Sequence, residues 1–297
     1  MTDIFKRKLK CIYTKILCTH TITPLLYVDY LRSYHRILNL SNPDTVGAKI
    51  QWIKKYGHLE RYTDLVDKYK VTEYVSNKIG DKYLPKIYGV YSVSSEINLE
   101  SLPEKFVLKC NHGSGEVFIC KNKRKISNKG WINIKKKLDK WMAINFYDVT
   151  KERQYKDIKR KIICEEYLED DSGSLKDYKI YCFNGKPEYI SVNVNSHTTQ
   201  LTVDYFDLDW NKYDEFNCIG EKNSLIEINR PENLSEMIKI AEILSKNFTY
   251  VRVDLRSVNG KTYFGELTFT SSNGTCPFKN REKEKQIASL IDLNNYH

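Results

Sequence analysis

The stretch from residue 105 to residue 120, KFVLKCNHGSGEVFIC, constrains the fold of this chain more than any other. Two runs rich in β-branched and aromatic residues, FVLKC and VFIC, flank a turn of Asn, Gly and Ser, and this pattern predicts a β-hairpin. Gly113 and Gly115 let the backbone approach a ligand and point N–H groups at it, and Lys109 can place an ammonium beside the same ligand. The stretch therefore indicates a phosphate-binding turn. It lacks the order of a Walker A loop, and a surface hairpin with a flexible tip fits it equally well.

The charge of the chain narrows the class of partner. The 297 residues carry a formal net charge of +10, which favours nucleotide phosphates, uronic-acid polymers, nucleic acid or an anionic membrane surface. No run of apolar residues is long enough to span a membrane. The eight cysteines contain no C-x-x-C pair, so we expect them to be reduced in a cytosolic protein without a zinc site.

Helical spacing of apolar residues marks several segments of the chain. Residues 1–40 are basic and aromatic and predict one or two amphipathic helices, which either pack on the protein or rest on an anionic membrane. Further helices are predicted over residues 49–56, 65–79, 129–146 and 232–248. Lys68 falls within the predicted helix over residues 65–79, where a solvated lysine is the simplest interpretation.

Alternating residues predict an antiparallel sheet in the second half of the chain. Strands are expected over residues 161–168, 176–183, 188–195 and 201–206, with an acidic linker at 169–173 and a hairpin turn at 184–186. These strands follow one another closely, which favours hairpin connections between them.

The last predicted hairpin carries acidic residues on one face. Arg252, Asp254, Glu266 and Thr268 alternate with apolar residues and therefore share the face away from the core. A three-residue turn at 259–261 places Asp254 opposite Glu266, where two like charges are destabilising unless a cation lies between them. Oxygen ligands of this kind suit Mg²⁺ bound to nucleotide phosphates. The alternatives are that Arg252 neutralises the pair or that the strands are shifted by one residue.

Together these features provide what a nucleotide site needs. The glycine turn and Lys109 serve phosphates, the acidic pair holds a metal, and the segment from Glu165 to Leu168 can offer main-chain groups to a base. The six histidines are scattered along the sequence and indicate no nucleophile constellation. This is consistent with phosphoryl transfer, which depends on positioning and charge neutralisation.

The order of these motifs resembles the ATP-grasp superfamily, and specifically its TupA-like members, which are associated with teichuronopeptide and other surface-polysaccharide biosynthesis. The segments that carry the resemblance are KIQWIKKY (49–56), DKYKVTEYV (67–75), KFVLKCNHGSG (105–115), EEYLED (165–170), DYKIYCFNGKP (177–187), FDLDWN (206–211) and YFGELTFT (263–270). The resemblance implies an α+β ATP-grasp fold with two α+β subdomains that grip ATP between antiparallel sheets. It implies an N-terminal helical region at 1–64, the N-terminal and glycine-loop subdomains at 65–168, and a C-terminal subdomain with the metal site at 169–297.

The resemblance also implies roles for individual residues. The implied nucleotide-binding residues are Lys68, Lys109, His112, Gly113, Ser114, Gly115, Glu165, Glu166, Tyr167, Leu168, Asp177 and Lys179. Arg252 and Lys179 match catalytic positions, and Asp254, Glu266 and Thr268 match metal positions. The chain departs from the family pattern at Thr268, where many members have Asn, at Thr72, where arginine is usual, and at residues 46–48.

The activity implied by the resemblance is that of a carboxylate–amine ligase that uses ATP and Mg²⁺ and forms an amide through an acylphosphate. A carboxylate-bearing sugar or polysaccharide and an amino acid are the implied partners, with no nucleic acid. We expect a cytoplasmic protein, with or without peripheral membrane contact through its N-terminus. One alternative is a glycosyltransferase of the same pathway, for which Asp207-Leu208-Asp209 is the only D-x-D candidate. A nucleic-acid-binding module is a second alternative, but the lysines are spread over many segments.

Overall fold

The computed structural model describes residues 3–17, 21–171, 175–196 and 198–296. The chain forms two compact units, and each is described here by itself. The first unit comprises Met1–Ile16, Glu60–Tyr74 and Leu84–Leu168, and the second comprises Leu17–Leu59, Val75–Tyr83 and Glu169–His297.

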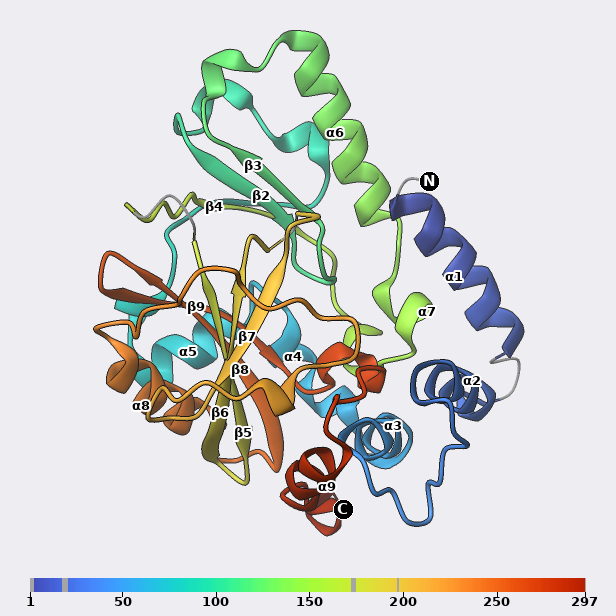
Figure 1. Ribbon diagram of the computed structural model, residues 1–297. Coiled ribbons are helices and arrows are strands. Elements are labelled where there is room, and N and C mark those ends of the chain that lie inside the picture. The colour runs from blue at the N-terminus through green and yellow to red at the C-terminus, as the bar shows by residue number, and fades with distance from the viewer. Residues whose placement is uncertain (1–2, 18–20, 172–174, 197, 297) are drawn as a thin grey trace. The chain divides into compact units, whose positions relative to one another are not determined.

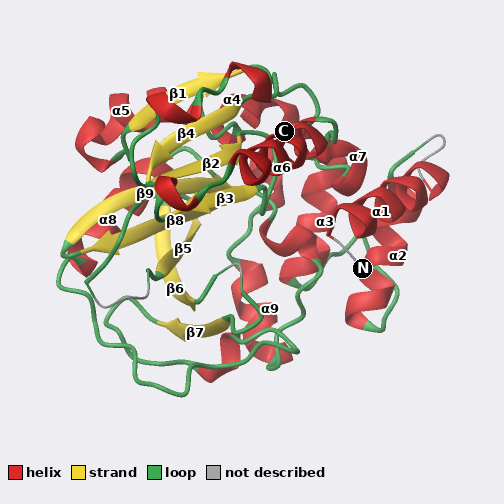
Figure 2. Cartoon of the chain, turned by 90° about the horizontal axis from the view of Figure 1, so that it is seen from above, coloured by secondary structure: helices red, strands yellow, loops and turns green. Residues whose placement is uncertain are grey.

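The first unit is built on a four-stranded antiparallel sheet in the order β1-β4-β2-β3, which Figure 2 shows from above. Its strands are β1 (Ile87–Tyr91), β2 (Phe106–Cys110), β3 (Val117–Cys120) and β4 (Ile162–Glu166). Strands β2 and β3 pair from Phe106↔Cys120 to Lys109↔Val117. The predicted hairpin is therefore confirmed, and its turn is residues 111–116.

Helix α6 (Asn128–Met142) covers this sheet (Figure 1). Trp131, Leu138 and Trp141 are buried on one side of the helix and join a core with Phe106 and Leu108. The opposite side carries lysines, as the helical spacing of the sequence predicted. The helix begins where the Ser127 hydroxyl accepts a hydrogen bond from the Gly130 N–H, a common N-cap arrangement.

Two predicted helices of the first unit are shorter than expected. Residues 129–146 divide into α6 and the short α7 (Phe146–Thr150), because Asn145 caps the second helix by accepting from the Tyr147 N–H. The predicted helix over 65–79 is interrupted in the same way. Helix α4 (Thr63–Val66) ends at Asp67, whose carboxylate accepts from the N–H groups of Tyr69 and Lys70.

Lys68 consequently lies in a turn and not within a helix, which corrects the sequence prediction. Helix α5 (Val71–Ile79) begins after this turn and is followed by Gly80. The periodic apolar residues on both sides suggested one helix, but a local side-chain hydrogen bond competes with the helical backbone pattern at Asp67. Only the part of α5 up to Tyr74 belongs to this unit, which also contains helix α1 (Asp3–Leu17) as far as Ile16.

The second unit is built on a five-stranded antiparallel sheet in the order β7-β6-β5-β8-β9. Its strands are β5 (Asp177–Phe183), β6 (Lys186–Val194), β7 (Thr202–Phe206), β8 (Tyr250–Val258) and β9 (Lys261–Thr268). Helix α8 (Leu234–Ser245) contacts β5, β6 and β8, and Figure 1 shows it beside them. Its apolar side is buried through Met237, Ala241 and Leu244. The predicted strands and helix are confirmed, with ends that move by a few residues.

The last hairpin has the predicted pairing of Asp254 with Glu266, but its turn and register differ from the prediction. Its turn has two residues, Asn259 and Gly260, both with positive φ, as a tight hairpin turn requires. From that turn alone Asp254 would face Gly265. A β-bulge between Asp254 and Leu255 shifts the register, so that Asp254 lies opposite Glu266 after all. The predicted three-residue turn is wrong, while the predicted pair is confirmed.

Three further α-helices lie in the second unit: α2 (Thr23–Tyr34), α3 (Val46–Tyr56) and α9 (Arg281–Ser289). Helix α3 holds the turn Ser271–Gly274, which follows β9. Gln51 of α3 donates to the carbonyl oxygens of Asn273 (2.9 Å) and Gly274 (3.2 Å). The buried ammonium of Lys54 donates to the Asn273 side chain at 2.6 Å. These contacts support an unusual turn in which Ser272, Asn273 and Gly274 all have positive φ.

A matched pair of glycine substitutions tests how tightly this turn packs. Gly274 and Gly80 both have positive φ, but an added Cβ at Gly274 would lie 3.0 Å from the Gly47 carbonyl oxygen, whereas the same atom at Gly80 meets nothing within 4 Å. We expect Gly80→Ala to lower the free energy of unfolding by about 1 kcal/mol through backbone strain. Gly274→Ala should cost about 1–3 kcal/mol more through overpacking. Urea unfolding measures both, and equal losses would contradict the packing of α3 on the turn.

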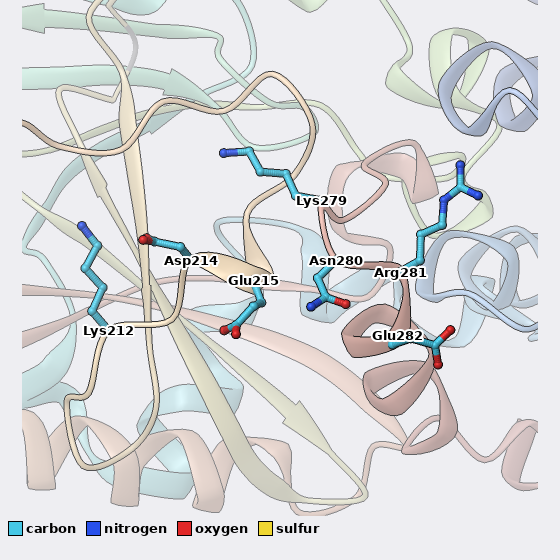
Figure 3. A pocket seen from close by; sticks show the side chains of 7 residues that line it. All are labelled: Lys212, Asp214, Glu215, Lys279, Asn280, Arg281 and Glu282. Carbon is cyan, nitrogen blue, oxygen red and sulfur yellow. The ribbon is translucent and has the colours of Figure 1, made fainter.

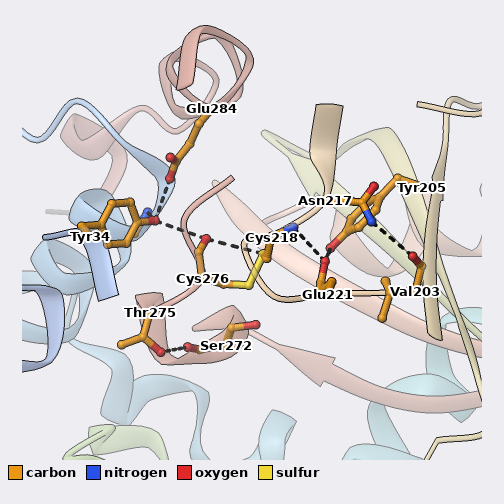
Figure 4. Close-up of a disulfide and its surroundings, with 11 residues drawn as sticks. Tyr34, Val203, Tyr205, Asn217, Cys218, Glu221, Ser272, Thr275, Cys276 and Glu284 are labelled. Atoms are coloured by element: carbon orange, nitrogen blue, oxygen red, sulfur yellow. Dashed lines mark hydrogen bonds between the residues drawn. A yellow bond between two sulfur atoms is a disulfide. The ribbon is translucent and has the colours of Figure 1, made fainter. Parts of the chain in front are cut away.

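The structure corrects the expectation that all cysteines are reduced. Cys218 and Cys276, 58 residues apart, form a disulfide, which Figure 4 shows beside the carboxylate of Glu221. That carboxylate accepts from the Cys218 N–H (2.8 Å) and from the Tyr205 hydroxyl (3.1 Å). Of the other cysteines in the described ranges, Cys110, Cys120, Cys164 and Cys182 are free and buried, and Cys11 is free and half-buried. None of the helices in the described part of the chain has both the length and the apolar character needed to cross a membrane.

Candidate functional site

The glycine turn of the first unit is joined to Lys68. The Lys68 ammonium donates to the Gly113 carbonyl oxygen at 2.5 Å, and the Lys68 N–H donates to the carbonyl oxygen of Asn111 at 3.1 Å. Ser114 and Gly115 are exposed at the tip, and Gly115 has a φ of 81°. Two elements that are distant in sequence thus place a cation at an exposed, glycine-containing backbone turn, which is the chemistry that an anion requires.

Lys109 lies on the same sheet and is paired with Glu165. Strands β2 and β4 are neighbours, and the Lys109 ammonium lies 2.5 Å from the Glu165 carboxylate, with 14% and 10% of the two side chains exposed. The Glu165 side chain is therefore engaged in an ion pair with Lys109. Of the predicted hinge residues, Glu166 ends β4, and its backbone N–H donates to the Lys86 carbonyl oxygen at 2.8 Å. Tyr167 and Leu168 lie beyond the end of the strand.

The side chain of His112 is directed into the first unit. It is buried, and its Nε2 lies 3.0 Å from the Ile144 carbonyl oxygen. Burial lowers the pKa of His112 to about 4, so the imidazole is neutral at physiological pH. A contact between His112 and a ligand at the turn would accordingly come from its backbone and not from a charged ring.

Sequence reasoning missed the residue that supports the glycine turn from outside. Arg7 of α1 donates to the Ser114 carbonyl oxygen and forms an ion pair with Glu116. Glu116 is buried directly against Gly113, where an added Cβ would collide with its carboxylate. The basic character of the N-terminus was visible in the sequence, but nothing in the order of residues indicated that Arg7 would meet residue 114 or 116.

The second unit gathers the other predicted residues on one face of its sheet. Lys179 lies opposite Asp254, Asp254 opposite Glu266, and Arg252 opposite Thr268. We call these five residues the β8–β9 cluster. Side chains alternate across a strand, so strand register alone places all of them on the same face.

Asp254 is the centre of the β8–β9 cluster. Its carboxylate accepts from Arg252 Nε at 2.6 Å and Nη2 at 2.8 Å, and lies 2.5 Å from the Lys179 ammonium. Arg252 Nη2 also reaches Glu266 at 3.3 Å and the Thr268 hydroxyl at 3.1 Å. Burial lowers the pKa of Arg252, but attraction to Asp254 outweighs burial and holds this pKa well above its ordinary value. The sequence alternative in which Arg252 neutralises the acidic pair is thus what this structure contains.

The donor set of the cluster also fits a hard divalent cation. Asp254, Glu266 and Thr268 supply only oxygen atoms, and the Thr268 hydroxyl lies 3.1 Å from the Glu266 carboxylate. Oxygen-only sites of this kind suit Mg²⁺, which also keeps several of its waters. Glu266 is the more accessible of the two acids, with 34% of its side chain exposed against 8% for Asp254. A cation would share the carboxylates with Arg252 and Lys179.

Asp177 lies on the same face, at the start of β5. Its carboxylate accepts from Ser196 at 2.6 Å and from Arg256 Nε at 2.8 Å. Burial raises the pKa of Asp177, but the positive charges of Arg256 and Lys179 and the Ser196 hydrogen bond outweigh it and lower that pKa overall. Arg256 was missed in the sequence, although the alternation of Arg252, Asp254 and Arg256 would have placed it on this face.

A shallow surface hollow of about 720 Å³ lies elsewhere in the second unit. Figure 3 shows its lining side chains, which come from the segment after β7 and from the start of α9. Lys212, Lys279 and Arg281 line it together with Asp214, Glu215 and Glu282. The charges are mixed and none of the predicted site residues takes part, so this hollow does not define a site.

The residues of the two units define a class of protein. The chain has two antiparallel sheets. The first carries a glycine turn next to two lysines, and the second carries an acidic pair with an arginine and a lysine. These are the components of an ATP-grasp protein. A family model described as TupA-like ATPgrasp matches residues 48–292. The chain belongs to the TupA-like ATP-grasp family, which confirms the resemblance seen in the sequence. No curated protein has a matching sequence.

Solved structures of ligases resemble the chain distantly. D-alanine–D-alanine ligase from Bacillus anthracis in complex with ATP is 14% identical, with a TM-score of 0.45 over 80% of this chain and 66% of that one. L-amino acid ligase from Bacillus licheniformis is 12% identical, with a TM-score of 0.44 over 71% of this chain and 44% of that one. The ATP-grasp ligase PsnB in complex with minimal precursor, Mg and ADP is 11% identical, with a TM-score of 0.40. That match covers 84% of this chain and 66% of the other. The chain thus spans less than two thirds of their lengths.

Proposed function

We propose that the chain is an ATP-dependent ligase that joins a carboxylate to an amine. The observation that carries the proposal is the β8–β9 cluster, in which two carboxylates from neighbouring strands meet one arginine and one lysine. Arg252 neutralises this acidic pair within the chain. Asp254, Glu266 and Thr268 nevertheless present only oxygen donors on one face, and 34% of the Glu266 side chain is exposed, which suits a hard divalent cation. Membership of the TupA-like ATP-grasp family supports the same assignment.

ATP and Mg²⁺ are the proposed co-substrate and metal. Asp254, Glu266 and Thr268 would hold the ion, which when bound neutralises phosphate charge. Lys68, Lys109 and the glycine turn at 113–115 would contact the phosphates. Asp177 would bind the ribose, and main-chain groups of residues 165–168 would contact the adenine. We also propose that residues 65–168 and 169–297 act as the two gripping parts of the enzyme.

The proposed reaction is an amide synthesis in two steps. The γ-phosphoryl group moves from ATP to an oxygen of the carboxylate substrate, and ADP leaves. The amine then attacks the carbonyl carbon, phosphate leaves, and the amine gives up a proton. Arg252 is held in place through two bonds to Asp254 and can orient the reacting carboxylate, while Lys179 offsets negative charge that develops there.

The proposed substrates are an amino acid and a uronic acid of a bacterial capsular or cell-wall polysaccharide. The net charge of +10 suits an anionic acceptor. The competing glycosyltransferase hypothesis depends on Asp207 and Asp209. Both carboxylate oxygens of Asp207 accept hydrogen bonds from Asn211 in the same turn, at 2.7 Å and 2.8 Å. Because Asp207 is thus engaged within its own turn, the ligase hypothesis is favoured. An N-terminal contact with an anionic membrane stays a prediction.

Product analysis tests the proposed function. The enzyme is incubated with Mg²⁺, ATP, a panel of amino acids and a uronate acceptor, and the mixture is analysed by mass spectrometry. We expect ADP and a product whose mass equals the sum of the two substrates minus one water. Reactions without the amine or without ATP serve as controls, and UDP-sugars replace ATP in a parallel set. A glycoside formed from a UDP-sugar, with no amide in any reaction, would overturn the proposal.

A further inference from the structure

The disulfide of the second unit belongs to a group of three side chains that can bind a metal. Cys218, Cys276 and Glu221 each place one ligand atom, a sulfur or a carboxylate oxygen, within 4.8 Å of the other two. Figure 4 shows the Glu221 carboxylate beside the two bonded sulfurs. Thiolate and carboxylate are both zinc ligands in proteins. The three residues lie outside the β8–β9 cluster and have no part in the proposed reaction.

A tight turn holds Glu221 against Cys218. The Glu221 N–H donates to the Cys218 carbonyl oxygen at 3.1 Å, and Glu221 Oε2 accepts from the Cys218 N–H at 2.8 Å. The Tyr205 hydroxyl lies 3.1 Å from Oε2 and 3.4 Å from Oε1. Oε1 is therefore the less engaged oxygen, and it is available to a cation. The sequence contains no C-x-x-C pair, but residues 218–221, CIGE, place a carboxylate where such a pair has its second thiolate.

Backbone hydrogen bonds join the two cysteine segments independently of the bond between the sulfurs. The segments form a short antiparallel bridge. The Ile219 N–H donates to the Pro277 carbonyl oxygen at 2.9 Å, and the Lys279 N–H donates to that of Asn217 at 2.8 Å. Reduction of the disulfide would therefore leave the two thiols side by side. Two sulfurs bound to one zinc lie about 3.8 Å apart, a spacing that side-chain rotation can reach because the two Cα atoms are 5.5 Å apart.

We propose that Cys218, Cys276 and Glu221 form a zinc site when the disulfide is reduced, with water as the fourth ligand. A dithiol reductant supplies two electrons: its own sulfurs become a disulfide, the bond between the two cysteine sulfurs breaks, and each sulfur takes a proton. Zn²⁺ then binds the two thiolates and the carboxylate, and the two thiol protons pass to solvent. Exchange with an oxidised disulfide takes the two electrons back, releases Zn²⁺ and restores the bond.

The ligand set favours zinc over the cation proposed for the β8–β9 cluster. Two thiolates are soft ligands, whereas Mg²⁺ and Ca²⁺ require oxygen. Three protein ligands with one open position are a common zinc arrangement. Cys276 and Glu221 are half-buried, so the site opens to solvent on their side. Either the disulfide or the ion fastens the segment after β7 to the segment before α9, and the reduced protein thus keeps a cross-link there. This inference does not depend on the proposed ligase function.

Metal binding to the full-length protein in its two redox states tests the proposal. The protein is reduced with dithiothreitol, freed of reductant without air, and titrated with Co²⁺ and then Zn²⁺ in excess Mg²⁺, which competes for oxygen-only sites. We expect one Co²⁺ per chain, with the near-ultraviolet absorption band of a cobalt–thiolate bond, and its displacement by Zn²⁺. Zinc at a hundredfold excess over its Kd should raise the Tm of the reduced protein by roughly 5 °C or more. The oxidised protein should show neither effect.

Matched variants identify the ligands. Glutamine can still accept from the Cys218 N–H, so Glu221→Gln should keep the fold, while zinc affinity should fall by at least about 10-fold, the loss seen even when an outer partner of a metal ligand is removed. Glu215→Gln makes the same change at an exposed position nearby and should keep the affinity. Cys218→Ser combined with Cys276→Ser should abolish the thiolate band, whereas Cys11→Ser, which removes a half-buried thiol elsewhere, should preserve it.

Four results would overturn the zinc site. The first is a disulfide that dithiothreitol leaves intact in the folded protein. The second is equal zinc affinity in the oxidised and reduced forms, which would place the ion elsewhere. The third is a zinc affinity of the double serine variant equal to that of the reduced, unaltered protein. The fourth is unchanged affinity in Glu221→Gln, which would remove the carboxylate from the ligand set. The Tm of the double serine variant should match that of the reduced, metal-free protein, which checks that it folds.

Discussion

Glu266→Gln is expected to reduce Mg²⁺-dependent ATP turnover by roughly 10³-fold or more, because several kcal/mol of charge stabilisation depend on the bound ion. Asp254→Asn should have an effect of the same size. Glutamine preserves the shape of Glu266, whose side chain is 34% exposed, so the fold should survive. Asp254 is buried between Arg252 and Lys179, and its neutralisation should also lower the free energy of unfolding, since two cations then lack their partner.

The measurement is ADP release at increasing Mg²⁺ concentration, together with the melting temperature of each variant. Asp209→Asn is the matched control: it makes the same chemical change at an exposed position, and it belongs to the motif on which the glycosyltransferase alternative depends. Turnover should be unchanged there. Unaltered ATP turnover in Glu266→Gln or Asp254→Asn would contradict the metal assignment, whatever happens to the control.

Lys109→Met is expected to weaken ATP binding by roughly 10- to 100-fold, the range of one hydrogen bond to a charged group. The substitution removes the ammonium of β2 and leaves the buried carboxylate of Glu165 without its partner at 2.5 Å. Stability should therefore fall as well. The double variant Lys109→Met with Glu165→Gln removes the unpaired charge, so it should recover much of the stability without recovering the affinity for ATP.

Affinity is measured by calorimetry with a non-hydrolysable ATP analogue, and stability by urea unfolding. Lys136→Met makes the same change on the exposed side of α6 and should leave the affinity intact, which controls for the loss of one net charge. If the double variant regained both stability and nucleotide affinity, Lys109 would be a structural partner of Glu165 and not a phosphate ligand.

The parts of the fold that were predictable depend on short stretches of chain. The hairpin around residues 111–116 and the alternation along β8 and β9 follow from turn residues and from the two-residue period of a strand. The family resemblance added the order of the motifs. Even here the register depended on more than local signals: Asp254 and Glu266 pair through a bulge at Gly265, and the hairpin turn alone would have separated them.

Other features were decided by contacts between distant segments. Asp67 interrupts a periodic helix and frees Lys68 to reach Gly113. The contact of Arg7 with Ser114 spans 107 residues, and that of Gln51 with Asn273 spans 222. No local propensity encodes such pairs, because each depends on how whole elements pack.

The amino-acid sequence by itself determined which strands and turns form and which residue types can serve phosphate and metal, since those properties depend on neighbours a few positions away. Only the tertiary structure decided that Arg252 and Lys179 both pair with Asp254 and that Cys218 meets Cys276. The reason is physical: burial, hydrogen-bond partners and pKa depend on groups that come together only when the chain has folded.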